Sequence, residues 1–150
     1  RFAARLAFNC IPQVGGLHGE DGASDHERNV GAELRRVLGS PDLGVQVAAV
    51  DLVEIGEHCM FANGCFVTDG NHRFDDPDKP VPWQGFTSKG PTRIGDNVWC
   101  GANVVITSGV AVGERSVIGA NSVVTEDIPP FSIAAGAPAK VLKQVDYDKT

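Results

Sequence analysis

The sequence predicts an all-β solenoid, in which short strands wind repeatedly around one shared core. Three observations lead to this prediction. Residues 94–129 divide into consecutive units of six residues, and residues 43–70 divide in the same way, although more weakly. The stretch between the two blocks breaks the period, because the spacing from Val67 to Ile94 is not a multiple of six. A repeat of this kind takes precedence over local patterns, since it determines the whole architecture.

Each unit of six reads as a short strand followed by a corner. Stacked units bury their first residues in a core that no single unit can form, and corner positions favour residues that tolerate a left-handed backbone. The first positions of the strong block are Ile94, Cys100, Ile106, Val112, Ile118 and Val124, and the fourth positions are Asn97, Asn103, Gly109, Arg115, Asn121 and Asp127. The inward residues of the weaker block are expected to be Leu43, Ala49, Ile55, Phe61 and Val67.

The repeat divides the chain into three parts. Residues 1–42 form an N-terminal helical and loop segment, with an amphipathic helix expected over residues 24–38 and ending at Gly39. We expect this helix to pack on the open end of the solenoid. Residues 43–143 form the solenoid, including the loop 71–93, and residues 144–150 form a C-terminal tail.

The loop over residues 71–93 is too long for a simple corner. Loops of this length in compact proteins are usually functional or disordered. This one contains Phe74, Trp83 and Phe86, which can become buried and ordered. We therefore interpret it as a functional arm that leaves the solenoid.

Composition narrows the classes of function. The net charge of −6 argues against nucleic-acid binding, and no apolar run is long enough to cross a membrane. The N-terminus lacks the apolar core of a signal peptide, so we expect a cytoplasmic protein. Cys10, Cys59, Cys65 and Cys100 show no C-x-x-C spacing, which favours buried thiols over a disulfide, and no metal site is predicted.

His72 is the strongest candidate for a catalytic group. It lies where the first repeat block ends and the arm begins, and rigid scaffolds commonly carry function on such loops. A histidine titrates near neutral pH, which suits a general base.

Three segments resemble a known family. GNHRFDD, GPTRIGDNVWCGANVVI and VIGANSVVTEDIPPFSIAAGAPAKVL are similar to the O-acetyltransferase branch of the hexapeptide-repeat acyltransferases, which includes galactoside, maltose and xenobiotic acetyltransferases. The resemblance implies a left-handed parallel β-helix and a homotrimer with active sites between subunits. It also implies acetyl-CoA as co-substrate and transfer of the acetyl group to a hydroxyl of a sugar or xenobiotic.

The resemblance assigns roles to particular residues. His72 would take the proton of the acceptor hydroxyl, which attacks the thioester directly, and a backbone N–H near Gly101 or Ala102 would stabilise the oxyanion. The positions that match the family's cofactor-binding residues are Trp99, Gly101, Ala102, Ala120, Thr125, Lys140 and Lys143. Asp69, Asn71 and Trp83 are candidates for acceptor binding. Pro41-Asp42-Leu43 stands where sugar acetyltransferases carry a substrate-binding Asn, which argues against a simple galactoside as acceptor.

Three other functions fit parts of the pattern. A zinc enzyme resembling γ-class carbonic anhydrases needs three histidines, but only His58 and His72 lie in the solenoid. A structural solenoid without activity would have no reason to combine His72, the arm and the GAPAK tail. An N-acetyltransferase of the same fold would differ only in the acceptor atom.

Overall fold

The computed structural model describes residues 2–4, 13–14 and 44–147. The helix expected over residues 24–38 lies outside these residues, as do Cys10 and Leu43. None of the helices among the described residues is long and apolar enough to cross a membrane.

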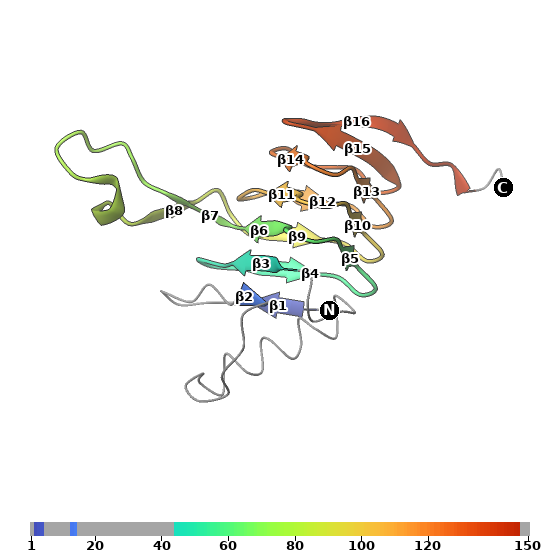
Figure 1. Ribbon diagram of the computed structural model, residues 1–150, viewed down its shortest axis with the longest axis horizontal. Coiled ribbons are helices and arrows are strands. Elements are labelled where there is room, and N and C mark those ends of the chain that lie inside the picture. Colours follow the sequence, from blue (N-terminus) through green and yellow to red (C-terminus); the bar gives the residue numbers. More distant parts are fainter. Residues whose placement is uncertain (1, 5–12, 15–43, 148–150) are drawn as a thin grey trace.

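The described strands form three sheets around one core and one separate hairpin (Figure 1). Sheet A contains β1 (Phe2–Ala4), β4 (Val53–Ile55), β9 (Thr92–Ile94) and β12 (Ala111–Val112). Sheet B contains β2 (Gln13–Val14), β3 (Val45–Ala48), β6 (Phe66–Thr68), β11 (Val105–Ile106) and β14 (Val123–Val124). Sheet C contains β5 (Met60–Phe61), β10 (Trp99–Cys100), β13 (Val117–Ile118), β15 (Ser132–Gly136) and β16 (Ala139–Gln144).

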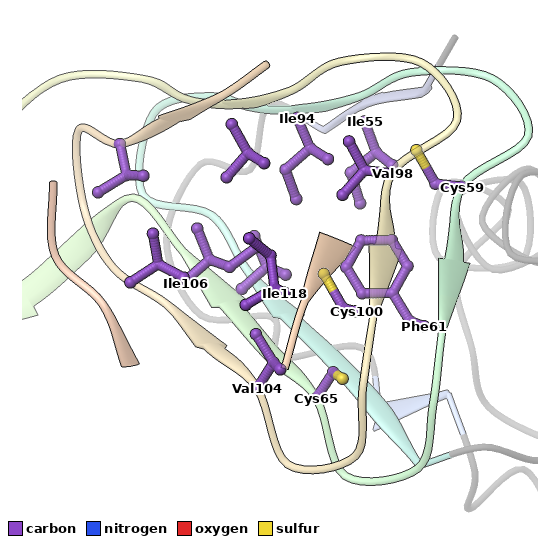
Figure 2. Close-up of a cluster of buried hydrophobic side chains, with 14 of the residues drawn as sticks. Ile55, Cys59, Phe61, Cys65, Ile94, Val98, Cys100, Val104, Ile106 and Ile118 are labelled. Atoms are coloured by element: carbon purple, nitrogen blue, oxygen red, sulfur yellow. The ribbon is translucent and has the colours of Figure 1, made fainter. Parts of the chain in front are cut away.

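From β3 to β15 the chain visits sheets B, A and C in turn, and each circuit adds one parallel strand to each sheet, except that the last circuit meets sheet A only in a bridge between Val112 and Ile128. β16 then pairs antiparallel with β15. Trp99 pairs with Val117, and Val105 pairs with Val123 in the same way. Both pairs are 18 positions apart, which is three units of six. The predicted all-β repeat architecture is thereby confirmed as a parallel β-helix. Figure 2 shows the strands as walls around the buried side chains.

The buried core is formed by the positions that the repeat predicts to point inward. All first positions of the strong block are buried, and Cys100, Ile106 and Ile118 are fully enclosed (Figure 2). The corners adopt the expected left-handed backbone at Asn97, Asn103, Gly109, Arg115 and Asn121. Asp127 also occupies the fourth position of its unit, but its backbone is not left-handed. Its Oδ1 instead accepts the N–H of Ala111 at 2.8 Å, which joins two successive coils.

In the first coil, the residue that points inward differs from the predicted one. Val47, not Ala49, pairs with Val67, and it is 1% exposed whereas Ala49 is only partly buried. This spacing is 20 positions instead of 18, so the coil contains two additional residues. They are accommodated between β3 and β4 at residues 50–52, where the backbone N–H groups bind the carboxylate of Asp69. A pattern of six cannot anticipate an insertion that a distant side chain stabilises.

The three cysteines within the described residues confirm the prediction of buried thiols. Cys59, Cys65 and Cys100 are free and lie in the core. Burial raises the pKa of all three, most strongly for Cys100, because a thiolate loses its hydration inside the core. These thiols therefore stay protonated and act as small apolar side chains.

Candidate functional site

An arm of residues 70–90 leaves the helix between β6 and β9 (Figure 1). Val67 pairs with Ile106, 39 positions further on, whereas Ile106 pairs with Val124 after only 18. The difference is the length of the arm. It contains β7 (Gly70–His72), the short 3-10 helix η1 (Val81–Trp83) and β8 (Phe86–Ser88), and β7 and β8 form an antiparallel hairpin.

His72 lies at the end of β7, directly opposite Phe86 on β8. The imidazole is exposed, and one side of it packs on the Phe86 ring with 4.5 Å between the ring centroids and a tilt of 38°. Asn71 is also exposed, and its partner across the hairpin is Thr87. The hairpin therefore presents His72 to the solvent while restricting its rotation.

Polar contacts beyond the hairpin hold the outer part of the arm. The Gln84 side chain accepts the N–H of Asp76 and donates to the carbonyls of Asp76 and Lys79. Arg73 pairs with Asp75 at 2.8 Å, and the hydrogen bond from this guanidinium lowers the pKa of the Asp75 carboxyl. Trp83 in η1 is 72% exposed, so the structure leaves it accessible at the outer part of the arm.

Asp69 has a different role from the acceptor contact that the sequence suggested. Its side chain is 0% exposed. The two carboxylate oxygens accept the N–H groups of Val50, Asp51 and Leu52 at 2.6–2.8 Å. A carboxylate enclosed in this way is unavailable to a substrate, and its function is to hold the enlarged corner of the first coil.

A second group of predicted residues lies along sheet C and the corner that follows it. Trp99 on β10 is half exposed and points outward between Met60 and Val117. Ala102 is partly exposed, and Ala120 lies exposed one coil further on. We call Trp99, Ala102 and Ala120 the sheet C strip. It is a shallow surface made of one aromatic and two small side chains.

Gly101 does not take the role that the sequence suggested. Its N–H donates to the carbonyl of Ile118 at 2.8 Å, so it cannot stabilise an oxyanion. A Cβ at this position would lie 2.7 Å from the backbone nitrogen of Ala120. The glycine is therefore required for close packing of two coils. The Ala102 N–H has no acceptor within the described part of the chain and remains the candidate donor.

The predicted lysines lie on the last strand. Lys140 and Lys143 are exposed on β16, and Lys143 is opposite Ile133 of β15. Lys140 Nζ lies 2.9 Å from Glu126 Oε2, so part of its charge is already neutralised in the free protein. Thr125 is exposed at the corner after β14.

The structure does not bring the two groups of site residues together within one chain. Figure 1 shows the hairpin β7–β8 leaving one side of the helix, while β5, β10 and β13 lie on the other side. Asn71 and His72 belong to the arm, whereas Trp99, Ala102 and Ala120 belong to sheet C and its corner. One described chain therefore does not form a site that uses both groups.

The outer faces of the three sheets differ in chemistry. The outward column of sheet C is apolar and consists of Met60, Trp99, Val117 and Ile133. That of sheet B is largely apolar and consists of Gln46, Phe66, Val105 and Val123. On sheet A, Glu54 and Arg93 form an ion pair at 2.6 Å across β4 and β9. Exposed apolar columns of this kind are typical of surfaces that contact other proteins.

A groove of about 570 Å³ runs along sheet A and contains none of the predicted site residues. Glu54, Arg93 and Asp127 contribute its charged groups, and Gly113 and Pro130 lie beside it. Because Glu54 and Arg93 pair with each other and Asp127 Oδ1 accepts a backbone N–H, these groups already have partners.

The sequence did not reveal the roles of two further residues, one in the arm and one at its base. Phe86 was noted only as an arm aromatic, because its pairing with His72 depends on the register of the hairpin. Ser108 occupies an ordinary position of the repeat, yet it is buried under the base of the arm. Among the described residues no group of three His, Cys, Asp or Glu side chains is placed to hold a metal ion.

Comparison with known proteins agrees with the repeat and the fold. Residues 91–126 match the hexapeptide repeat of succinyl-transferase. A probable acetyltransferase of Mycobacterium tuberculosis is 43% identical over 91 residues, which are 61% of this chain and 30% of that protein. The chain spans about a third of the length of the curated relatives it matches.

Two solved structures resemble most of the chain. A maltose O-acetyltransferase from Clostridium difficile has a TM-score of 0.59 and 29% identity, with 84% of this chain and 80% of that chain covered. A hexapeptide-repeat acetyltransferase from Vibrio cholerae in complex with acetyl-CoA has a TM-score of 0.52 and 26% identity, with 82% and 80% covered.

The fold and the repeat are therefore similar to those of hexapeptide-repeat proteins. Within that class, the chain is similar to acetyltransferases.

Proposed function

We propose that this chain is an acetyl-CoA-dependent O-acetyltransferase that uses His72 as general base. The observation that carries the proposal is the position of His72, exposed on the β7–β8 hairpin and held against Phe86. The likeness to a maltose O-acetyltransferase supports transfer to a hydroxyl oxygen, and the acetyl-CoA complex of the Vibrio cholerae protein supports the donor. We include in the proposal the left-handed coil that the family resemblance implies.

In the proposed reaction, His72 accepts the proton of the acceptor hydroxyl as its oxygen attacks the thioester carbonyl of acetyl-CoA. The Ala102 N–H donates a hydrogen bond to the oxyanion of the tetrahedral intermediate. When the carbon–sulfur bond breaks, CoA leaves as the thiol after His72 returns the proton to sulfur. Lys140 and Lys143 attract the phosphates, and Trp99, Ala120 and Thr125 border the pantetheine arm. Asn71 and Trp83 contact the acceptor.

We further propose that the active protein is a homotrimer with composite sites. The separation of His72 from the sheet C strip supports this arrangement, since neither group is complete alone. The apolar outer columns of sheets B and C supply two different faces, which suits a head-to-tail contact repeated around a threefold axis. The charged column of sheet A then faces solvent.

The first experiment is calorimetric titration with acetyl-CoA, followed by turnover assays with maltose, a galactoside and chloramphenicol as acceptors. His72→Asn should lower kcat by roughly 10²–10⁴-fold, which is the usual contribution of a general base, while binding of acetyl-CoA persists. His58→Asn is the matched control, because His58 is an exposed histidine whose left-handed backbone Asn also tolerates. Absence of acetyl-CoA binding, or full turnover by His72→Asn, contradicts the proposal.

Mixing two inactive variants tests the composite site. Ala120→Trp blocks the sheet C strip, and His72→Asn removes the base, so each homo-oligomer should be inactive. Mixed oligomers that form by subunit exchange should regain activity, because some of their sites combine an intact His72 from one subunit with an intact Ala120 from its neighbour. A mixture that stays inactive after verified exchange contradicts a site shared between copies.

A further inference from the structure

Ser108 is buried at a position of the repeat where other residues are accessible. It is the third residue of its unit, a position held elsewhere by Asp96, Ala102, Glu114, Ala120 and Glu126. All of those residues are exposed or partly exposed, whereas Ser108 is 4% exposed. The difference arises because the base of the arm passes over this coil.

The Ser108 hydroxyl joins both chain segments of that base. It donates to the carbonyl of Asp69, which leads out to β7, and accepts the N–H of Lys89, which returns from β8, at 2.8 Å. A second hydroxyl, that of Thr92, donates to the carbonyl of Thr68 at 2.9 Å and accepts the N–H of Gly109 at 3.1 Å. Ser108 is therefore a clamp between the outgoing and returning segments of the arm and the coil next to them.

Asp69, which the clamp holds on the outgoing segment, lies three residues before His72. Between Asp69 and His72 the outgoing segment pairs with the returning one at Gly70–Ser88, Asn71–Thr87 and His72–Phe86. The Thr68 hydroxyl also exchanges local hydrogen bonds with the N–H and carbonyl of Gly70. A two-stranded hairpin is marginally stable without further contacts, so the direction of this one depends on how its base is fixed. A displacement of about 1 Å at a catalytic group is enough to lower a rate substantially.

We propose that Ser108 is a positioning residue for His72, which it holds in place through the base of the arm. This inference rests on the proposed function of His72 as general base. Loss of the hydroxyl leaves the Asp69 carbonyl and the Lys89 N–H without their buried partner, and the hairpin then pivots relative to the coil.

The test compares Ser108→Ala with Ser116→Ala in the full chain. Ser116 is also buried, donates to the carbonyl of Pro129 and accepts the N–H of Ser132, but it lies away from the arm. We expect Ser108→Ala to lower kcat about tenfold with the KM for acetyl-CoA changed less than twofold. Ser116→Ala should keep the wild-type kcat at a temperature where both variants are folded by circular dichroism.

Amide hydrogen exchange gives a readout that is independent of turnover. Exchange at residues 71–73 and 86–89 should accelerate about tenfold in Ser108→Ala and stay unchanged in Ser116→Ala. If the two variants match in both kcat and arm exchange, the proposal is wrong. If the wild type transfers no acetyl group, the proposed function fails, while the exchange data still decide whether Ser108 fixes the arm.

Discussion

The coils bury their apolar side chains, whereas the arm exposes its own. Ile55, Phe61 and Ile106 in the coils are 0% exposed, while Phe74 and Trp83 in the arm are 80% and 72% exposed. The arm keeps its shape through hydrogen bonds from Gln84 and through the buried hydroxyls of Thr92 and Ser108 at its base. Stability and activity are therefore expected to respond to different substitutions in the two regions.

The largest effect is expected from a truncation in the coils. Phe61→Ala removes a fully enclosed aromatic ring and should lower the free energy of unfolding by about 3–5 kcal/mol, measured by urea denaturation. Phe74→Ala in the arm is the matched control, and its effect should stay within about 0.5 kcal/mol because the ring is exposed. Equal losses for both variants would remove the distinction between the two regions.

A smaller effect is expected when the ring beside His72 is removed. Phe86→Ala should lower kcat about tenfold, which corresponds to about 1.4 kcal/mol, because His72 loses the contact that restricts its ring. The free energy of unfolding should change by less than about 1 kcal/mol, since Phe86 is half exposed. Phe86→Tyr should restore turnover, and Phe74→Ala should leave it unchanged. A loss of stability without a loss of kcat would make Phe86 a structural residue only.

The smallest expected effect is a loss of stability in alkaline solution, and it arises from a buried thiol in the coils. Burial keeps the pKa of Cys100 well above 9.0, the value of a free thiol. The contribution of this thiol to stability is complete below that pH and is lost as the pH rises, because the unfolded chain releases the proton first. By pH 9 the loss is about 0.4 kcal/mol. Between pH 7 and 9, the free energy of unfolding from urea denaturation should decline less with pH in Cys100→Ala than in the wild type. Identical pH dependence in the two proteins would contradict a raised pKa for Cys100.

The sequence predicted the coils well because their information is local. Each unit of six contains its own inward residue and its own corner residue, so the buried column and most left-handed corners were predicted residue by residue. The prediction was wrong at the first coil, where Val47 replaces Ala49 in the core. That shift depends on Asp69, which binds a corner 17–19 positions earlier.

The candidate site was predicted only in part, for a similar reason. His72 was identified from its place at the start of the arm and from the family resemblance, whereas Trp99 was identified from the resemblance alone. The roles given to them stay predictions. Gly101 and Asp69 were assigned to ligands, but the structure uses both internally, one to let two coils approach and one to hold a corner. Residue type alone does not distinguish a group that faces a ligand from one that has a partner within the chain.

The sequence by itself determined that this chain forms an all-β structure of stacked six-residue units, because a short repeat specifies strand, corner and core together. It also located the arm, expected over residues 71–93, because the period stops and resumes there, although the structure returns the chain to the coil earlier and places Thr92–Ile94 in β9. Only the tertiary structure decided that Phe86 packs on His72, that Ser108 clamps the arm, and that His72 and Trp99 lie on different sides of one chain. Those relations join residues that are distant in sequence, and they arise from hairpin register and coil stacking, which no local pattern encodes.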